Sequence, residues 1–142
     1  MHLLLVEDNP GDVFLLREAS ATFIEQGSLQ CSTVTDGTQA LAFLRHQEPY
    51  TQAASPDLIL LDLNLPGTSG YEVLAELQQD PELKCIPVVV LTSSSRQEDI
   101  NRCYELGANA YLVKPPGLEQ GLSLLRSTVT FWSTCKFRIL KD

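Results

Sequence analysis

Short apolar runs alternate along the chain with longer stretches in which apolar residues recur at helical spacing. The apolar runs predict five strands, at residues 2–6, 29–34, 58–62, 86–92 and 108–113. The stretches between them predict five helices, at residues 10–25, 36–46, 69–79, 96–106 and from Leu118 onward. The pattern is that of five strand–helix units in succession.

Three of the predicted strands, at residues 2–6, 58–61 and 86–91, are continuous apolar runs without polar alternation. Such runs are typical of strands in a parallel sheet whose two faces are both covered. Because crossovers between parallel strands are right-handed, few topologies remain. We expect an α/β fold with a doubly wound, five-stranded parallel sheet in the flavodoxin-like order 2-1-3-4-5, with helices on both faces.

The predicted helices carry sequence signals at their ends. Asn9 is a good N-cap residue, and Pro10 suits the first helical position. Capping-box pairs mark three further helix starts, namely Asp36 with Gln39, Ser69 with Glu72, and Ser95 with Glu98. Gly107 is expected to end the fourth helix in the left-handed conformation.

The composition indicates one globular domain. The chain has 142 residues, of which 44% are hydrophobic and 20% charged, and its formal net charge is −8. This acidic balance argues against nucleic-acid binding, which needs a basic surface. No apolar run approaches the roughly 18 residues of a membrane helix, and no secretion signal precedes the first strand. We expect a cytoplasmic protein that makes no membrane contact.

Polar side chains follow the predicted strands where these end. They are Glu7 and Asp8 after the first strand, Asp62 and Asn64 after the third, Thr92 and Ser93 at the end of the fourth, and Lys114 after the fifth. In a doubly wound sheet the carboxyl ends of the strands share one edge, and ligands bind there near the topological switch point. We therefore expect carboxylates, hydroxyls and one ammonium group to converge.

Clustered carboxylates repel one another, and a divalent cation relieves that repulsion. All-oxygen ligands favour Mg²⁺, and a carboxylate beside such an ion can attack phosphorus to form an aspartyl phosphate. Lys114 would then stabilise the transferred phosphoryl group, and Thr92 would hydrogen-bond one of its oxygens. Each residue alone also has a structural interpretation, as a helix cap, a loop residue or a surface lysine. Only their combination indicates a site.

Four segments resemble the receiver domain of two-component response regulators. They are LLLVEDNPGD (3–12), LILLDLNLPGTSGYEVL (58–74), IPVVVLTSS (86–94) and ELGANAYLVKP (105–115). The resemblance spans nearly the whole chain. It implies that Asp62 accepts a phosphoryl group from a phosphohistidine on a sensor histidine kinase. It also implies Mg²⁺-dependent self-phosphorylation and autodephosphorylation.

The resemblance also assigns roles within the site. Asp8 and Asp62 would be carboxylate ligands of Mg²⁺ or Mn²⁺, Glu7 would assist through water, and Asn64 would offer its backbone carbonyl. Lys114 would pair with the phosphoryl group, and its peptide bond to the following proline would be cis.

Thr92 and Tyr111 match the switch pair of the same family. The resemblance implies that the hydroxyl moves toward the phosphoryl group while the aromatic ring turns inward. The output face would then comprise the helix at 96–106, the strand at 108–113 and the last helix. Tyr111 also fits a purely structural role as a half-buried strand aromatic.

The end of the chain is apolar for a terminus. Residues 1–133 are assigned to the receiver domain and residues 134–142 to an extension too short for an effector domain, so output is expected through protein contact. The apolar residues are Phe131, Trp132, Phe137, Ile139 and Leu140. They either seal the core or extend a homodimer interface on the output face. The EDNPGD and LTSS segments and the Phe131–Trp132 pair further resemble small regulators paired with cyanobacterial phytochromes, which would make a phytochrome the kinase.

Three other functions remain open from the sequence. A pseudo-receiver that binds partners without phosphorylation is disfavoured by the complete set of Glu7, Asp8, Asp62 and Lys114. An Mg²⁺-dependent phosphatase or phosphotransferase would have a second acid two residues after its nucleophile, where this chain has Asn64. A flavin-binding module would have a Ser-, Thr- and Gly-rich loop after the first strand, where this chain reads EDNPGD.

Overall fold

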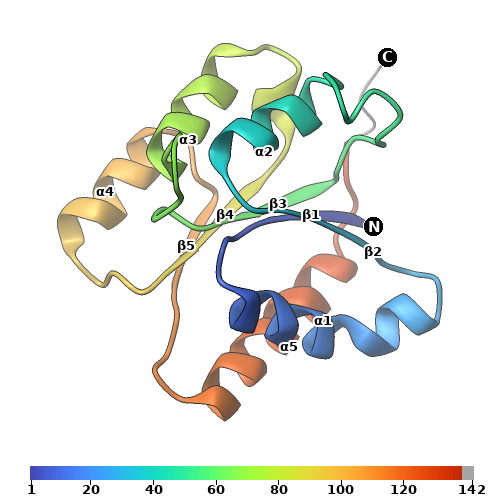
Figure 1. Cartoon of the computed structure of the whole chain (residues 1–142). Coiled ribbons are helices and arrows are strands. Elements are labelled where there is room, and N and C mark those ends of the chain that lie inside the picture. The colour runs from blue at the N-terminus through green and yellow to red at the C-terminus, as the bar shows by residue number, and fades with distance from the viewer. Residues whose placement is uncertain (139–142) are drawn as a thin grey trace.

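Five parallel strands form the centre of the fold (Figure 1). The computed structural model describes residues 1–138, so the predicted apolar residues Ile139 and Leu140 lie outside the described residues. The strands are β1 (His2–Val6), β2 (Gln30–Val34), β3 (Leu58–Leu61), β4 (Val88–Thr92) and β5 (Ala110–Val113). Their order, β2-β1-β3-β4-β5 with parallel pairing throughout, confirms the predicted topology.

Helices cover both faces of this sheet, as Figure 1 shows. They are α1 (Pro10–Glu25), α2 (Gly37–Leu44), α3 (Gly70–Gln79), α4 (Gln97–Glu105) and α5 (Leu118–Ser133), with a short 3₁₀ turn, η1, at Leu83–Cys85. Helices α1 and α5 lie on one face, and α2, α3 and α4 lie on the other. Among residues 1–138, no helix is both long and apolar enough to cross a membrane.

Successive side chains of the central strands point to opposite faces of the sheet, so each strand contributes to the hydrophobic core on both faces. Leu58 and Leu60 of β3 pack with the α1–α5 side, whereas Ile59 and Leu61 pack with the α2–α3–α4 side. All four residues of this strand are buried. The continuous apolar run is therefore explained, because a strand with two covered faces has no solvent side on which to place a polar residue.

The helix ends follow the predicted capping signals with one exception. The Asn9 side chain accepts a hydrogen bond from the backbone of Gly11, and Gly107 has a φ of 97°, as predicted. The capping box predicted at Ser95 is wrong, since α4 begins at Gln97 with Arg96 as its N-cap residue. The Ser94 hydroxyl instead accepts the Arg96 backbone N–H at 3.2 Å and forms the turn before the helix.

The predicted cis bond between Lys114 and Pro115 is also wrong. Within residues 1–138, the cis peptide bond is Glu48–Pro49, and the bond before Pro115 is trans. Trans is the isomer that bonds to proline favour, by about 0.5–1 kcal/mol.

Candidate functional site

Carboxylates from two adjacent strands meet at the carboxyl edge of the sheet. Glu7 and Asp8 follow β1, and Asp62 follows β3. One carboxylate oxygen from each of the three residues lies within 4.8 Å of the other two. Glu7 and Asp62 are buried, whereas Asp8 is exposed. The predicted convergence of these side chains is confirmed.

The backbone around Asp62 is held from two directions. Its N–H donates to the carbonyl of Val6 at 3.1 Å, which continues the β1–β3 pairing beyond the end of β3. On the other side, the Gly70 N–H at the start of α3 donates to the Leu63 carbonyl at 3.1 Å. A Cβ at position 70 would lie 2.5 Å from the Asp62 carbonyl oxygen, so only glycine lets α3 begin this close.

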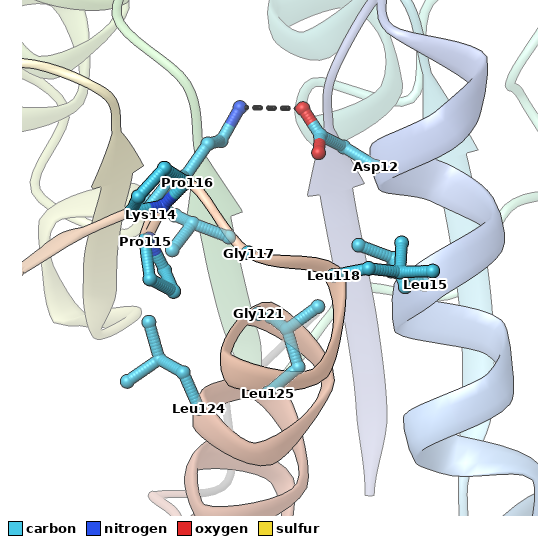
Figure 2. Close-up of a pocket in the computed structure, with 11 residues that line it drawn as sticks. Asp12, Leu15, Lys114, Pro115, Pro116, Gly117, Leu118, Gly121, Leu124 and Leu125 are labelled. Atoms are coloured by element: carbon cyan, nitrogen blue, oxygen red, sulfur yellow. Dashed lines mark hydrogen bonds and ion pairs between the residues drawn. The ribbon is translucent and has the colours of Figure 1, made fainter.

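Lys114 reaches this cluster from the end of β5. Its Nζ lies 2.5 Å from Glu7 Oε1, 2.9 Å from Asp12 Oδ2 and 3.6 Å from Asp62 Oδ2. Figure 2 shows the pair with Asp12, which faces Lys114 from the first turn of α1. Asp12 is not among the site residues predicted from the sequence. The available signal was its place four residues after Asp8, within the same acidic segment.

An apolar pocket of about 230 Å³ lies beside this ion pair, between the first turns of α1 and α5 (Figure 2). Most of its lining side chains are apolar, including those of Leu15, Leu91, Pro115, Leu124 and Leu125. Lys114 also lines this pocket, and its ammonium group pairs with Glu7 and Asp12.

Burial and like charge set the protonation of the site. Burial is the main reason that the pKa of Glu7 rises to about 7, and Asp62 adds to the rise while the hydrogen bond from Lys114 opposes it. Burial alone would favour the neutral amine of Lys114. Its hydrogen bonds to Glu7 and Asp12 and the charge of Asp62 outweigh burial, so its pKa lies above the ordinary value.

The donor set fits a hard divalent cation. Glu7, Asp8 and Asp62 bring only oxygen donors to one point, and Lys114 is the one ammonium group paired with the cluster in the described residues. Closely spaced carboxylates with oxygen-only chemistry favour Mg²⁺ or Mn²⁺ over softer metals. Asn64 is exposed beside them, and its N–H donates to Asp62 Oδ1 at 3.3 Å. The role of its carbonyl oxygen stays a prediction.

The Thr92 hydroxyl is buried and has no hydrogen-bond partner among the described residues. An unsatisfied buried hydroxyl costs about 1–3 kcal/mol, and an incoming oxygen at the site would remove that cost. Tyr111 is half-buried, and its hydroxyl donates to the Ser94 carbonyl at 2.9 Å, two residues beyond Thr92. These positions suit the predicted switch pair, whose movement stays a prediction.

Comparisons with known proteins agree with this geometry. The family model for the response regulator receiver domain matches residues 3–126. Response regulator Rcp1 from Synechocystis sp. is 44% identical over 130 residues, which cover 92% of this chain and 87% of Rcp1. The probable methanogenesis regulatory protein FilR2 from Methanothrix harundinacea is 35% identical over 92% of this chain and 82% of its own length.

Solved structures give the same result. The phosphorylated cyanobacterial phytochrome response regulator RcpA superposes with a TM-score of 0.90 at 44% identity, covering 97% of this chain and 98% of RcpA. The Mn(2+)-bound form of Rcp1 superposes with a TM-score of 0.90 at 41% identity, covering 97% and 99%. The predicted similarity to regulators of cyanobacterial phytochromes is confirmed.

Receiver domains as a family accept a phosphoryl group on an aspartate and bind Mg²⁺ or Mn²⁺. The acidic cluster at the sheet edge, the topology and the match over residues 3–126 agree with one another. The chain belongs to the response regulator receiver domain family.

Proposed function

We propose that this chain accepts a phosphoryl group from the phosphohistidine of a sensor kinase onto Asp62, in the cytoplasm, and signals by protein contact. One observation carries the proposal. Asp62 is held at the end of a fully buried central strand, in a cluster with Glu7 and Asp8, and its Oδ2 lies 3.6 Å from Lys114 Nζ. A carboxylate kept beside like charges and a cation suits phosphoryl transfer better than structural support.

The transfer makes one bond and breaks another. A carboxylate oxygen of Asp62 attacks phosphorus, an O–P bond forms, the N–P bond to the donor imidazole breaks, and the imidazole leaves and takes up a proton. Lys114 stabilises the negative charge on the phosphoryl oxygens. The unpartnered Thr92 hydroxyl donates to one of those oxygens. The product carries about two negative charges where Asp62 carried one.

A divalent cation belongs to this proposal. Mg²⁺ or Mn²⁺ would be held by Asp8 and Asp62 directly, by the Asn64 carbonyl, and by Glu7 through water. When bound, it would supply positive charge to the carboxylates and the phosphoryl oxygens. The oxygen-only donor set supports this assignment, as does the description of the Rcp1 structure as a Mn(2+)-bound form. Self-phosphorylation from small donors and autodephosphorylation are expected to require the cation.

The proposed kinase is a phytochrome. Support comes from RcpA, which is described as a cyanobacterial phytochrome response regulator and is 44% identical to this chain. Transfer from a purified phytochrome kinase should be faster than transfer from an unrelated histidine kinase at equal concentration. Equal rates would contradict a phytochrome as the specific kinase, but they would not contradict the phosphoacceptor function of Asp62.

We also propose a homodimer through the face of α4, β5 and α5 and the chain end. Val113 of β5 and Phe131 of α5 expose 39% and 61% of their surface. Phe137 stacks on Trp132 with ring centroids 6.3 Å apart, so this part of the tail covers its own domain. Sedimentation of the full chain should show a dimer and Phe131→Ser a monomer. A Phe131→Ser variant that stays dimeric would contradict this interface.

Intact mass measurement tests the phosphoacceptor proposal. The full chain with a small phosphodonor and Mg²⁺ should gain one phosphate, and Asp62→Asn should gain none. Asp36→Asn is the matched control, since Asp36 also follows a strand at this edge and its cap bond to Gln39 at 2.7 Å survives the change. No gain with any donor would favour a phosphorylation-independent interaction module. Repeated turnover of small phosphoesters would favour a phosphatase.

A further inference from the structure

A side-chain relay holds the loop that follows Thr92, and the phosphoryl-transfer chemistry above does not use it. Asp99, in the first turn of α4, accepts a hydrogen bond on each carboxylate oxygen. The Ser94 hydroxyl donates to Oδ2 at 2.6 Å, and the Tyr71 hydroxyl donates to Oδ1 at 2.7 Å. One carboxylate therefore joins the β4–α4 loop to both α3 and α4.

The α3 end of the relay begins directly behind Asp62. Tyr71 follows Gly70, the residue whose backbone lies against the Asp62 carbonyl. On its other side, the Tyr71 ring lies 4.0 Å from the guanidinium carbon of Arg102. Both contacts fix the ring, so the Tyr71 hydroxyl has a defined position from which to meet Asp99.

The loop end of the relay lies two residues beyond Thr92. Besides its bond to Asp99, Ser94 accepts the Tyr111 hydroxyl on its carbonyl at 2.9 Å and the Arg96 N–H on its own hydroxyl at 3.2 Å. The chain is thus held on one side by β4 and on the other by Ser94. Any movement of Thr92 toward Asp62 is confined between these two points.

Hydrogen bonds to an ionised group are stronger than those between neutral groups. The bonds from Ser94 and Tyr71 hold the pKa of Asp99 below its ordinary value, so the carboxylate stays charged at neutral pH. The relay therefore consists of two charge-assisted bonds that share one acceptor. Removing either donor leaves Asp99 held by one of these two bonds only.

We propose that Asp99 is a positioning residue, whose bonds to Tyr71 and Ser94 set the β4–α4 loop so that Thr92 meets the phosphoryl group on Asp62. This inference rests on the proposed phosphoacceptor function and adds a regulatory connection to it. The same relay links the start of α3, behind Asp62, to the loop that follows Thr92. A change at Asp62 therefore reaches α4 from two sides.

The first test needs no phosphorylation. Backbone hydrogen exchange is measured at Arg96 in the full unphosphorylated chain, for the wild type, Tyr71→Phe and Asp99→Asn. Both variants should exchange about tenfold faster, because Asp99, which fixes Ser94, loses its bond from Tyr71 in the first variant and its charge in the second. Tyr104→Phe, on the exposed side of α4, is the matched control and should match the wild type. Unchanged exchange in Tyr71→Phe would overturn the relay.

The second test measures the initial rate of Asp62 phosphorylation at saturating Mg²⁺. Tyr71→Phe and Ser94→Ala should each slow it about fivefold to tenfold, and the double variant should be no slower than the slower single one, since both donors act through Asp99. Additive losses, or rates equal to the wild type, would overturn the positioning role. If the wild type accepts no phosphate on Asp62, the proposed function fails, and the exchange measurement alone decides whether the relay exists.

Discussion

The two edges of the sheet carry polar side chains in opposite circumstances. At the amino edge, Asp57 accepts the His2 N–H at 2.8 Å, and Asn109 accepts the Val88 N–H at 2.9 Å. Each side chain satisfies a backbone donor at a strand start. At the carboxyl edge, three carboxylates crowd within 4.8 Å, and the Thr92 hydroxyl lacks a partner in the described part of the chain. The amino-edge side chains complete the backbone hydrogen bonding of the fold, whereas the carboxyl edge offers oxygen ligands and a free hydroxyl donor to a bound group.

The histidine at the amino edge shows the same contrast. Burial lowers the pKa of His2, which favours the neutral ring, and its two nitrogens lie near the Ser32 hydroxyl at 2.8 Å and the Ser55 carbonyl at 3.3 Å. At the carboxyl edge, burial instead raises the pKa of Glu7 to about 7, beside other carboxylates. The amino edge thus holds a neutral ring between two hydrogen-bond partners, whereas the carboxyl edge gathers several carboxylates around Lys114.

Among substitutions at the two edges, Lys114→Ala is expected to lower the free energy of unfolding most. It removes the cation from Glu7 and Asp12 and leaves buried negative charge uncompensated. The free energy of unfolding in urea without Mg²⁺ should fall by about 3 kcal/mol well above pH 7. The loss should shrink as the pH falls toward 7, because Glu7 without the lysine takes up a proton at a higher pH than in the wild type. A loss under about 0.5 kcal/mol at high pH would mean that the carboxylates are solvated after all.

Asn109→Ala is expected to act at the amino edge through stability alone. The Val88 N–H loses its acceptor, which should lower the free energy of unfolding by about 2 kcal/mol. The phosphorylation rate of the folded fraction should not change. Asn101→Ala, an exposed amide on α4, is the control and should stay within about 0.5 kcal/mol of the wild type. A slower phosphorylation rate in Asn109→Ala would contradict the claim that the amino edge contributes to stability alone.

Cation binding should depend on pH through Glu7. Its pKa is raised in the folded, cation-free protein to about 7, so the carboxyl group is protonated below that value and ionised above it. Mg²⁺ needs the ionised form, and its affinity should therefore fall up to about tenfold per pH unit below 7 and level off above it. Calorimetric titration across this range measures the effect. In Glu7→Gln the dependence should disappear, and a slope that persists there would assign it to another group.

The smallest stability effect is expected from Asp62→Asn. The amide oxygen keeps the bond from the Asn64 N–H, and the change removes one of the crowded charges while losing the 3.6 Å contact with Lys114. Stability should stay within about 1 kcal/mol of the wild type, although phosphorylation is lost. Urea unfolding decides the point. A large loss would show that Asp62 supports the fold and would weaken the contrast between the edges.

Much of the fold follows from the sequence because the central strands are covered on both faces. LILL at 58–61 has no polar alternation, which places it inside a parallel sheet, and the right-handed crossover rule then restricts the order. The strand ends likewise place Asp8, Asp62 and Lys114 on one edge. These conclusions need only local patterns and one topological rule.

Other features depend on how helices sit against each other, and local patterns do not encode this. Asp12 meets Lys114 because the lysine side chain reaches from the end of β5 to the first turn of α1, although β3 and β4 lie between β1 and β5. Tyr71 meets Asp99 across the space between α3 and α4. The capping box predicted at Ser95 does not form. Ser94, one residue earlier, donates its hydroxyl to Asp99 instead, and α4 begins after Arg96. Side chains that bridge separate elements are visible only once the packing is known.

Chemical trapping of the phosphorylated residue tests the central claim most directly. The chain is phosphorylated with a small donor and Mg²⁺ and treated with borohydride, which reduces an acyl phosphate to the alcohol and leaves free carboxylates unchanged. Peptide mass spectrometry then locates the reduced residue. Reduction is expected at Asp62 alone, in the wild type and in Asp36→Asn. Reduction at Asp8 or Asp12, or phosphate on a residue that borohydride does not reduce, would contradict it.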